Sequence, residues 1–259
     1  FISVGFALLI SICSFAQSGI SAINLRCEYL TNPLGNDSYN PRLTWQISDA
    51  RRGARQAAYR IIVDIDSIAV ISGKAGEWNS GWRNSDKMLV RYNGRRLKPF
   101  TKYYWSVAIA DKDNKKSQIA RIASFETGMM EMMNWQGSWI SDVDDVDLKP
   151  APYFRSVFNT AKKIKSARAY IAAGGLYELF LNGKKVGNHR LDPIYTRFDR
   201  RTLYVTYDVT SHLQSGHNAV GVLLGNGWYN HQSTAVWNFH KAPWRARPTF
   251  CLDLRITYE

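Results

Sequence analysis

Residues 167–230 read ARAYIAAGGLYELFLNGKKVGNHRLDPIYTRFDRRTLYVTYDVTSHLQSGHNAVGVLLGNGWYN, and this segment is the most informative about the fold. Residues 177–181 (YELFL) alternate between apolar and other positions, as a half-buried strand requires. Asn182-Gly183 follows directly, and this pair readily adopts the two positive φ angles of a tight hairpin turn. Gly174-Gly175 predicts a bend or bulge just before the strand.

Two more strands are expected in the same stretch. Residues 202–207 alternate, and residues 219–224 are almost wholly apolar. Between them, Asp208 is expected to cap the short turn 209–213, because its carboxylate accepts from free backbone N–H groups. The pattern predicts a β-sandwich and not a nucleotide-binding fold.

Three segments of this region resemble the N-terminal sandwich of bacterial α-L-rhamnosidases. They are GLYELFLNGKKVGNHRLDP (175–193), RTLYVTYDVTSHL (201–213) and AVGVLLGNGWYN (219–230), and they occur in the order of that family. The resemblance implies a galactose-binding-like jelly roll. It also implies that catalysis belongs to a later helical barrel, which this chain does not reach.

The N-terminal half predicts a separate β domain. Residues 43–47 and 59–65 are expected strands, and residues 97–107 keep a strict period of two. Residues 97–114 look like the fibronectin type III strand that carries the tyrosine corner. Residues 26–47 resemble the opening of many bacterial rhamnosidases.

The predicted fold is therefore all-β, with two domains. A fibronectin type III-like sandwich occupies residues 17–128, and the jelly roll occupies residues 129–259. Residues 250–258 form its last expected strand. In the resembling family more strands follow, so the jelly roll is expected to be incomplete at its C-terminus, with an exposed edge.

Residues 1–16 are read as a signal peptide with a truncated start. The apolar run 1–14 is too short to span a bilayer, and Ser14-Phe15-Ala16 places small residues where a signal peptidase reads. We expect an exported protein, periplasmic or extracellular, with no membrane span after cleavage. Cys27 and Cys251 then remain, and two buried free thiols are expected.

The formal net charge is +13, and its basic residues fall in small clusters near predicted turns. A solvated surface is the expected role of these clusters. An acidic polysaccharide ranks second as a partner. Nucleic acid is not expected, because no nucleic-acid-binding motif accompanies the charge.

No catalytic residue, metal site or cofactor is predicted. Glycoside hydrolysis needs two facing carboxylates, and Glu178 is the only carboxylate within residues 175–181. The acidic run 142–147 lacks the Gly and Glu of an EF-hand and reads as an exposed loop. Some similar sandwiches bind rhamnose through calcium held by an Asp-Asn pair, but here that place reads Asn188-His189.

Sugar binding is the remaining chemistry, because apolar sugar faces stack on Trp and Tyr while amides read hydroxyls. For Trp228 itself, docking on a neighbouring domain is favoured over sugar stacking. The Gly-Trp that the family carries after Leu-Asp-Pro is replaced here by Ile194-Tyr195. The candidate carbohydrate-binding residues are Asn226, Trp228, Tyr229, Trp237 and Trp244.

The resulting hypothesis is the non-catalytic N-terminal part of an exported α-L-rhamnosidase. Its expected partners are a rhamnose-containing glycan, reached through the whole enzyme, and the absent C-terminal catalytic domain. The resemblance implies release of terminal rhamnose with inversion. The alternatives are a stand-alone glycan-binding or adhesion protein and a spacer that binds nothing.

Overall fold

The computed structural model describes residues 19–234 and 237–259, so the expected signal peptide lies outside the described residues. The described chain divides into two compact units. The first comprises the described residues up to Thr31, Asn40–Arg95 and Tyr103–Ser124; the second comprises Asn32–Tyr39, Arg96–Lys102 and Phe125–Glu259. None of the helices in the described ranges is long and apolar enough to cross a membrane.

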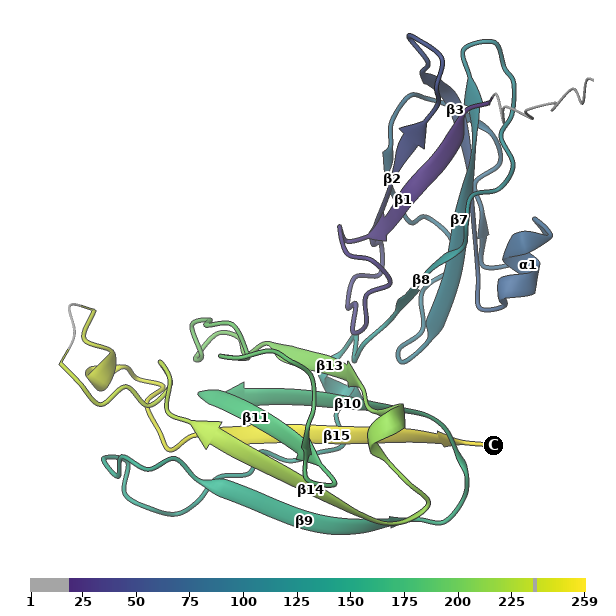
Figure 1. The fold of residues 1–259 in the computed structure, drawn as a ribbon. Helices are drawn as coiled ribbons and strands as arrows, with labels where there is room; N and C mark the ends of the chain where they lie inside the picture. The colour runs from purple at the N-terminus through teal and green to yellow at the C-terminus, as the bar shows by residue number, and fades with distance from the viewer. Residues whose placement is uncertain (1–18, 235–236) are drawn as a thin grey trace, which may run out of the picture. The chain divides into compact units, whose positions relative to one another are not determined.

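The first unit is a sandwich of two antiparallel sheets (Figure 1). One sheet has the order β1-β2-β6, and the other has the order β4-β3-β7-β8, with β5 also paired to β3. The elements are β1 (Ser21–Cys27), β2 (Arg42–Ser48), β3 (Gln56–Asp64), α1 (Ser67–Ile71), β4 (Trp78–Asn79), β5 (Arg83–Asn84), β6 (Leu89–Arg91), β7 (Lys102–Asp111) and β8 (Ala123–Glu126).

The core of the first unit follows from the alternation of its strands. Trp45 of β2 and Trp105 of β7 are both buried. The Trp45 indole nitrogen donates to Gln56 Oε1 at 2.8 Å, which satisfies its one polar group inside the core. Cys27 is a buried free thiol, as expected, and burial raises its pKa to about 12. The strands predicted at 43–47 and 59–65 correspond to β2 and β3, whereas the one expected over residues 97–107 begins only at Lys102, because a turn with Phe100 at φ of 53° precedes it.

The second unit is a sandwich of a three-stranded sheet, β13-β10-β15, and a four-stranded sheet, β12-β11-β14-β9. Its core is built from the inward side chains of both sheets. The elements are η1 (Met132–Asn134), β9 (Tyr153–Thr160), β10 (Ile164–Gly174), β11 (Leu176–Leu181), β12 (Lys184–Lys185), β13 (Tyr204–Asp208), η2 (Thr210–His212), β14 (Gly216–Gly225), η3 (Phe239–Lys241) and β15 (Thr249–Tyr258).

The turn chemistry read from the sequence is confirmed in this unit. Asn182 and Gly183 have φ of 50° and 77° and connect β11 to β12. Asp208 accepts from the Thr210 backbone nitrogen at 3.0 Å and caps the turn that contains η2. At Gly175, φ is +110°, and the chain passes there from one sheet to the other. The predicted bend is thus a crossing between the two sheets.

Residues that belong to the second unit but precede its strands in sequence cover the outer face of the β13-β10-β15 sheet; they include Asp37, Phe100 and Glu126, the last residue of β8. Arg168 of β10 forms a two-pronged ion pair with Glu126, at 2.8 and 2.9 Å, and both side chains are nearly buried. The Tyr204 hydroxyl donates to Asp37 at 2.6 Å. Tyr170 packs edge-on against Phe100, with ring centroids 5.5 Å apart. These contacts bury a sheet face that would otherwise meet solvent.

The last strand lies at the edge of its sheet, but this edge is only partly open. β15 ends its sheet beside β10, and Ile140 covers the start of its free edge by exchanging two backbone hydrogen bonds with Phe250, at 2.8 and 3.0 Å, while β9 ends the opposite sheet. An apolar groove of about 270 Å³ lies between the sheets, and β9, β14 and β15 all contribute side chains to it. Cys251 of β15 faces away from this groove and is a buried free thiol, as expected.

Candidate functional site

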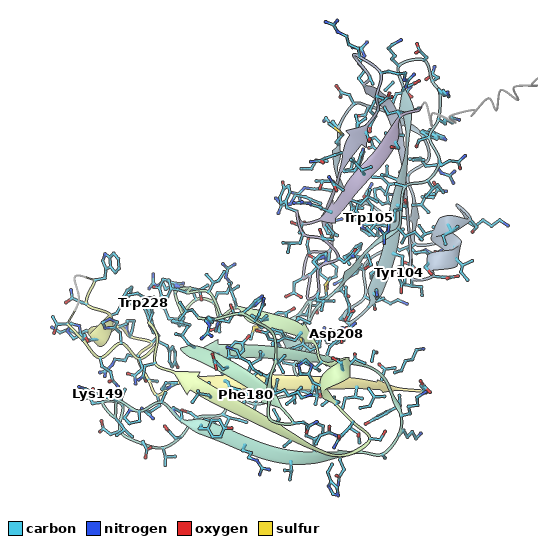
Figure 2. All side chains as sticks on the ribbon, viewed as in Figure 1. Tyr104, Trp105, Lys149, Phe180, Asp208 and Trp228 are labelled. Carbon is cyan, nitrogen blue, oxygen red and sulfur yellow. The ribbon has the colours of Figure 1, made fainter. Side chains whose placement is uncertain are left out.

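One end of the second unit carries a continuous group of aromatic side chains. They come from two loops, one between β12 and β13 and one between β14 and β15. Figure 2 shows Trp228 at this end, where β14 terminates. In this group the ring centroid of each member lies within 6.5 Å of the ring centroid of another member. We call the group the aromatic cluster, and its members are Tyr195, Phe198, Trp228, Tyr229, His231, Trp237, Phe239 and Trp244.

Trp228 is the centre of the cluster. Gly227 has φ of +50°, which lets the backbone turn sharply after β14. The Trp228 ring stacks on His231, with centroids 5.2 Å apart and planes 5° apart, and it packs on Phe239 at 5.3 Å. About 41% of Trp228 stays exposed. Its indole is therefore held by neighbouring rings and still reaches solvent.

A pocket of about 300 Å³ opens beside this ring. None of its lining residues is acidic, and His231 is the only titratable side chain among them apart from the phenol of Tyr195. The pocket is lined mainly by aromatic and aliphatic side chains. It is lined by Gly175, Leu176, Leu191, Pro193, Tyr195, Phe198, Gly227, Trp228 and His231. We call it the aromatic pocket.

A chain of hydrogen bonds anchors the loop that forms one wall. Asp192 accepts from the Tyr207 hydroxyl at 3.3 Å and lies 2.8 Å from His189 Nδ1. Tyr207 also bonds the Tyr177 hydroxyl at 3.0 Å. Burial raises the pKa of Tyr207 to about 12, so the phenol stays protonated and can donate. The loop before Pro193 is thereby fixed to β11 and β13.

The candidate residues read from the sequence separate into two groups. Trp228 lines the pocket. The ring centroid of Trp237 lies 6.4 Å from that of Trp228, and 71% of Trp237 is exposed. Tyr229 packs against Phe198 behind the pocket wall. Trp244 Nε1 donates to the Trp228 carbonyl oxygen at 3.4 Å and supports the loop.

The amide of Asn226 is engaged within the protein. Its Nδ2 donates to the Lys149 carbonyl oxygen at 2.7 Å, and its Oδ1 accepts from the side-chain amide of Asn230 at 3.2 Å. Asn226 does not line the aromatic pocket. The side-chain amide of Asn226 therefore ties its own loop to the backbone of Lys149 and to Asn230.

Sequence reasoning missed several residues that line the pocket. Tyr195 and Phe198 form one wall, and His231 lies parallel to Trp228 on the other. Tyr195 is the residue that stands in place of the tryptophan of the resembling family, so an aromatic ring is retained there. Its ring lies 6.5 Å from that of Trp228, a distance joining residues 33 positions apart in the sequence.

Three of the carboxylates considered for chemistry have basic partners. Glu178 accepts from Lys185 Nζ at 2.5 Å. Asp142 is paired with the buried Arg247 at 2.6 Å, and this hydrogen bond holds the pKa of Asp142 below its usual value. Asp147 accepts from Arg245 at 2.5 Å. The acidic loop is therefore fixed by two arginines that precede β15, a long-range contact that its own sequence does not indicate.

Two protein families match the chain in tandem. The family described as Rha78A-like, N-terminal immunoglobulin domain matches residues 22–131, and the family described as α-L-rhamnosidase N-terminal domain matches residues 162–259. An α-L-rhamnosidase of Formosa agariphila is 36% identical over 222 residues, which are 77% of this chain and 23% of that protein. The chain belongs to the N-terminal region of the α-L-rhamnosidase family.

Solved α-L-rhamnosidases have the same fold in this region. That of Dictyoglumus thermophilum is 33% identical with a TM-score of 0.83, covering 92% of this chain and 28% of that one. That of Aspergillus terreus is 26% identical with a TM-score of 0.78, covering 93% and 28%. The chain spans about a quarter of the length of the α-L-rhamnosidases that it matches.

Proposed function

We propose that this chain is the non-catalytic N-terminal part of an exported α-L-rhamnosidase and that its jelly roll binds a saccharide in the aromatic pocket. The whole enzyme would release terminal α-L-rhamnose with inversion, using carboxylates outside this chain. The tandem match to the two N-terminal families supports the first statement. The observation that carries the second is the exposed Trp228 in the wall of the pocket.

The pocket has the properties that a pyranose ring requires. A flat aromatic wall can cover the apolar C–H face of a sugar, which removes that face from water. A volume of about 300 Å³ lies within the usual range for small-ligand sites. Tyr195 brings a hydroxyl to a lining that is otherwise apolar, and His231 brings its Nε2, since its Nδ1 accepts from the Ser233 backbone nitrogen at 3.3 Å. These polar atoms can read sugar hydroxyls and fix the orientation of the ring.

The hollow shape favours saccharide binding over domain docking as the role of Trp228. A docking tryptophan protrudes into a pocket of its partner. Trp228 instead packs against His231 and Phe239 and forms one wall of a concave site. A stand-alone glycan-binding protein would use the same pocket. The order of the two matched families favours the enzyme, because both are N-terminal rhamnosidase domains.

Calorimetric titration of the purified chain with L-rhamnose and with rhamnose-bearing oligosaccharides tests the binding function. We expect saturable binding with one site for each chain. Absence of heat with every rhamnose-bearing ligand would reject the saccharide site and leave a scaffold role. Separation of periplasmic, extracellular and cytoplasmic fractions of the producing cells tests export.

A further inference from the structure

A second hollow adjoins the aromatic pocket and carries charge. Its volume is about 360 Å³, and it shares the side chains of Leu176 and Leu191 with the aromatic pocket. Glu178 and Arg190 are its charged lining residues. A ligand that fills the aromatic pocket and extends past Leu191 therefore meets these two side chains.

The two charged side chains are not equivalent. Glu178 is neutralised by Lys185, whose Nζ lies 2.5 Å from Oε1. Arg190 is exposed, and in the described parts of the chain no carboxylate lies within ion-pair distance of it. The adjoining hollow therefore presents one guanidinium whose charge no neighbour balances.

The surrounding loops add positive charge, and their carboxylates are already paired with basic side chains. Asp192 is engaged by His189 at 2.8 Å, and Asp199 by Arg197 at 2.9 Å. Arg200 and Arg201 follow the pocket residue Phe198 closely in sequence. Both are exposed, and neither forms an ion pair among the described residues. Residues 209–252, which include the other loop of the site, contain no Asp or Glu at all.

We infer that the saccharide bound at this site is anionic, with a carboxylate or a sulfate ester that pairs with Arg190. The inference rests on the proposed saccharide-binding function and names the class of its ligand. A planar guanidinium matches the two oxygens of a carboxylate or sulfate group, and such charge-assisted bonds are roughly twice as strong as neutral ones. The excess positive charge also favours an anionic ligand over a neutral one at long range.

The test compares ligands of equal length by calorimetric titration. One rhamnose-bearing oligosaccharide carries a uronic acid, a second carries a sulfate ester, and a third is neutral. We expect at least one anionic ligand to bind about tenfold more tightly than the neutral one, as one charge-assisted contact provides. Raising the salt concentration narrows this difference. Whichever of the two anionic oligosaccharides binds more tightly shows whether the site prefers a carboxylate or a sulfate ester.

Arg190→Gln then separates a specific contact from general charge. This variant is expected to lower the affinity for the anionic ligand to that for the neutral one, with the neutral affinity unchanged. Lys165→Gln is the matched control. Lys165 is an exposed residue near the start of β10, and the aromatic cluster lies at the opposite end of this strand, where Gly174 lies against Tyr229. Polyglutamate, which carries no sugar, is expected not to compete.

Three results would overturn the inference. Equal affinities for anionic and neutral ligands would leave saccharide binding standing but reject an anionic ligand. An anionic preference that Lys165→Gln reduces as much as Arg190→Gln would show net charge and not a site. Binding of none of the three ligands would reject the inference together with the saccharide site itself.

Discussion

The Trp228 indole lies parallel to the His231 imidazole, with ring centroids 5.2 Å apart and planes 5° apart. Phe239 and Tyr195 meet the same indole at 58° and 71°, so three rings fix its orientation. An exposed side chain that is held in this way loses little conformational freedom when a ligand binds. This is the arrangement expected of a preformed binding wall.

The first prediction concerns the crossing at Gly175. A Cβ added there would lie 2.4 Å from the Gly225 carbonyl oxygen, and φ is +110°. We expect Gly175→Ala to lower the free energy of unfolding by roughly 3 kcal/mol, through backbone strain and steric clash together. The measurement is urea unfolding followed by fluorescence.

Gly216→Ala is the control for that substitution. Gly216 also has a positive φ, +89°, but an added Cβ would meet nothing within 4 Å. The backbone cost alone is about 1–2 kcal/mol. Equal destabilisation by the two variants would contradict the close approach of β11 and β14 at Gly175.

The second prediction concerns the Glu126–Arg168 ion pair. Both side chains are nearly buried, with 8% and 15% of their surface exposed, so Glu126→Gln leaves a buried guanidinium whose remaining carboxylate partner among the described residues is Asp208, at 3.0 Å. We expect the free energy of unfolding to fall by about 3 kcal/mol. Glu259→Gln breaks an exposed pair with Lys163 and should cost less than about 1 kcal/mol. A small effect of Glu126→Gln, equal to that of Glu259→Gln, would contradict the buried pair.

The third prediction follows from the Asp142–Arg247 pair. The hydrogen bond from Arg247 lowers the pKa of Asp142 below its ordinary value of 3.8. A carboxyl whose folded pKa is depressed contributes stability above its unfolded pKa, and this stability is lost as the pH falls through the folded pKa. The stability difference between wild type and Asp142→Asn should therefore be full above pH 3.8 and shrink below it.

Urea unfolding at a series of pH values measures this difference. Asp144→Asn is the control, because Asp144 is exposed in the same loop and forms no ion pair among the described residues. A difference that stays constant as the pH falls below 3.8 would show that Asp142 contributes through packing and not through its charge.

Local sequence patterns predicted strands such as β11 because their burial alternates residue by residue. Residues 177–181 place three side chains in the core and two toward solvent, and the Asn182-Gly183 turn needs only its own two residues. The period of two and the turn chemistry are local properties. Neither indicated that the Gly174-Gly175 bend crosses between sheets, because this depends on which strands pair.

The aromatic pocket was only partly predictable for the same physical reason. Trp228 stands next to glycine at the end of an apolar strand, a local signal, but Tyr195 and Phe198 reach it from a loop 30 or more residues away. Asn226 was read as a sugar ligand because its amide is polar. Its donor is used by the Lys149 carbonyl oxygen, a contact across 77 positions of the chain that no local pattern reveals.

The fourth prediction is that the chain hydrolyses no rhamnoside. Glu178 is bound to Lys185, and no carboxylate lines the aromatic pocket, so a facing acid and base are missing there. We expect no release of nitrophenol from a nitrophenyl α-L-rhamnoside. Release that Glu178→Gln abolishes would contradict this assignment.

The saccharide affinity of Trp228→Ala is the most direct measure of whether the aromatic pocket binds sugar. Calorimetric titration with a rhamnose-bearing oligosaccharide compares wild type, Trp228→Ala and Trp139→Ala; Trp139 is similarly exposed, at 53%, and lies outside the aromatic cluster. We predict that Trp228→Ala weakens binding by more than about tenfold, as loss of a central aromatic contact does, while Trp139→Ala binds like wild type. Wild-type affinity in Trp228→Ala would contradict saccharide binding at this ring and favour a role in domain docking.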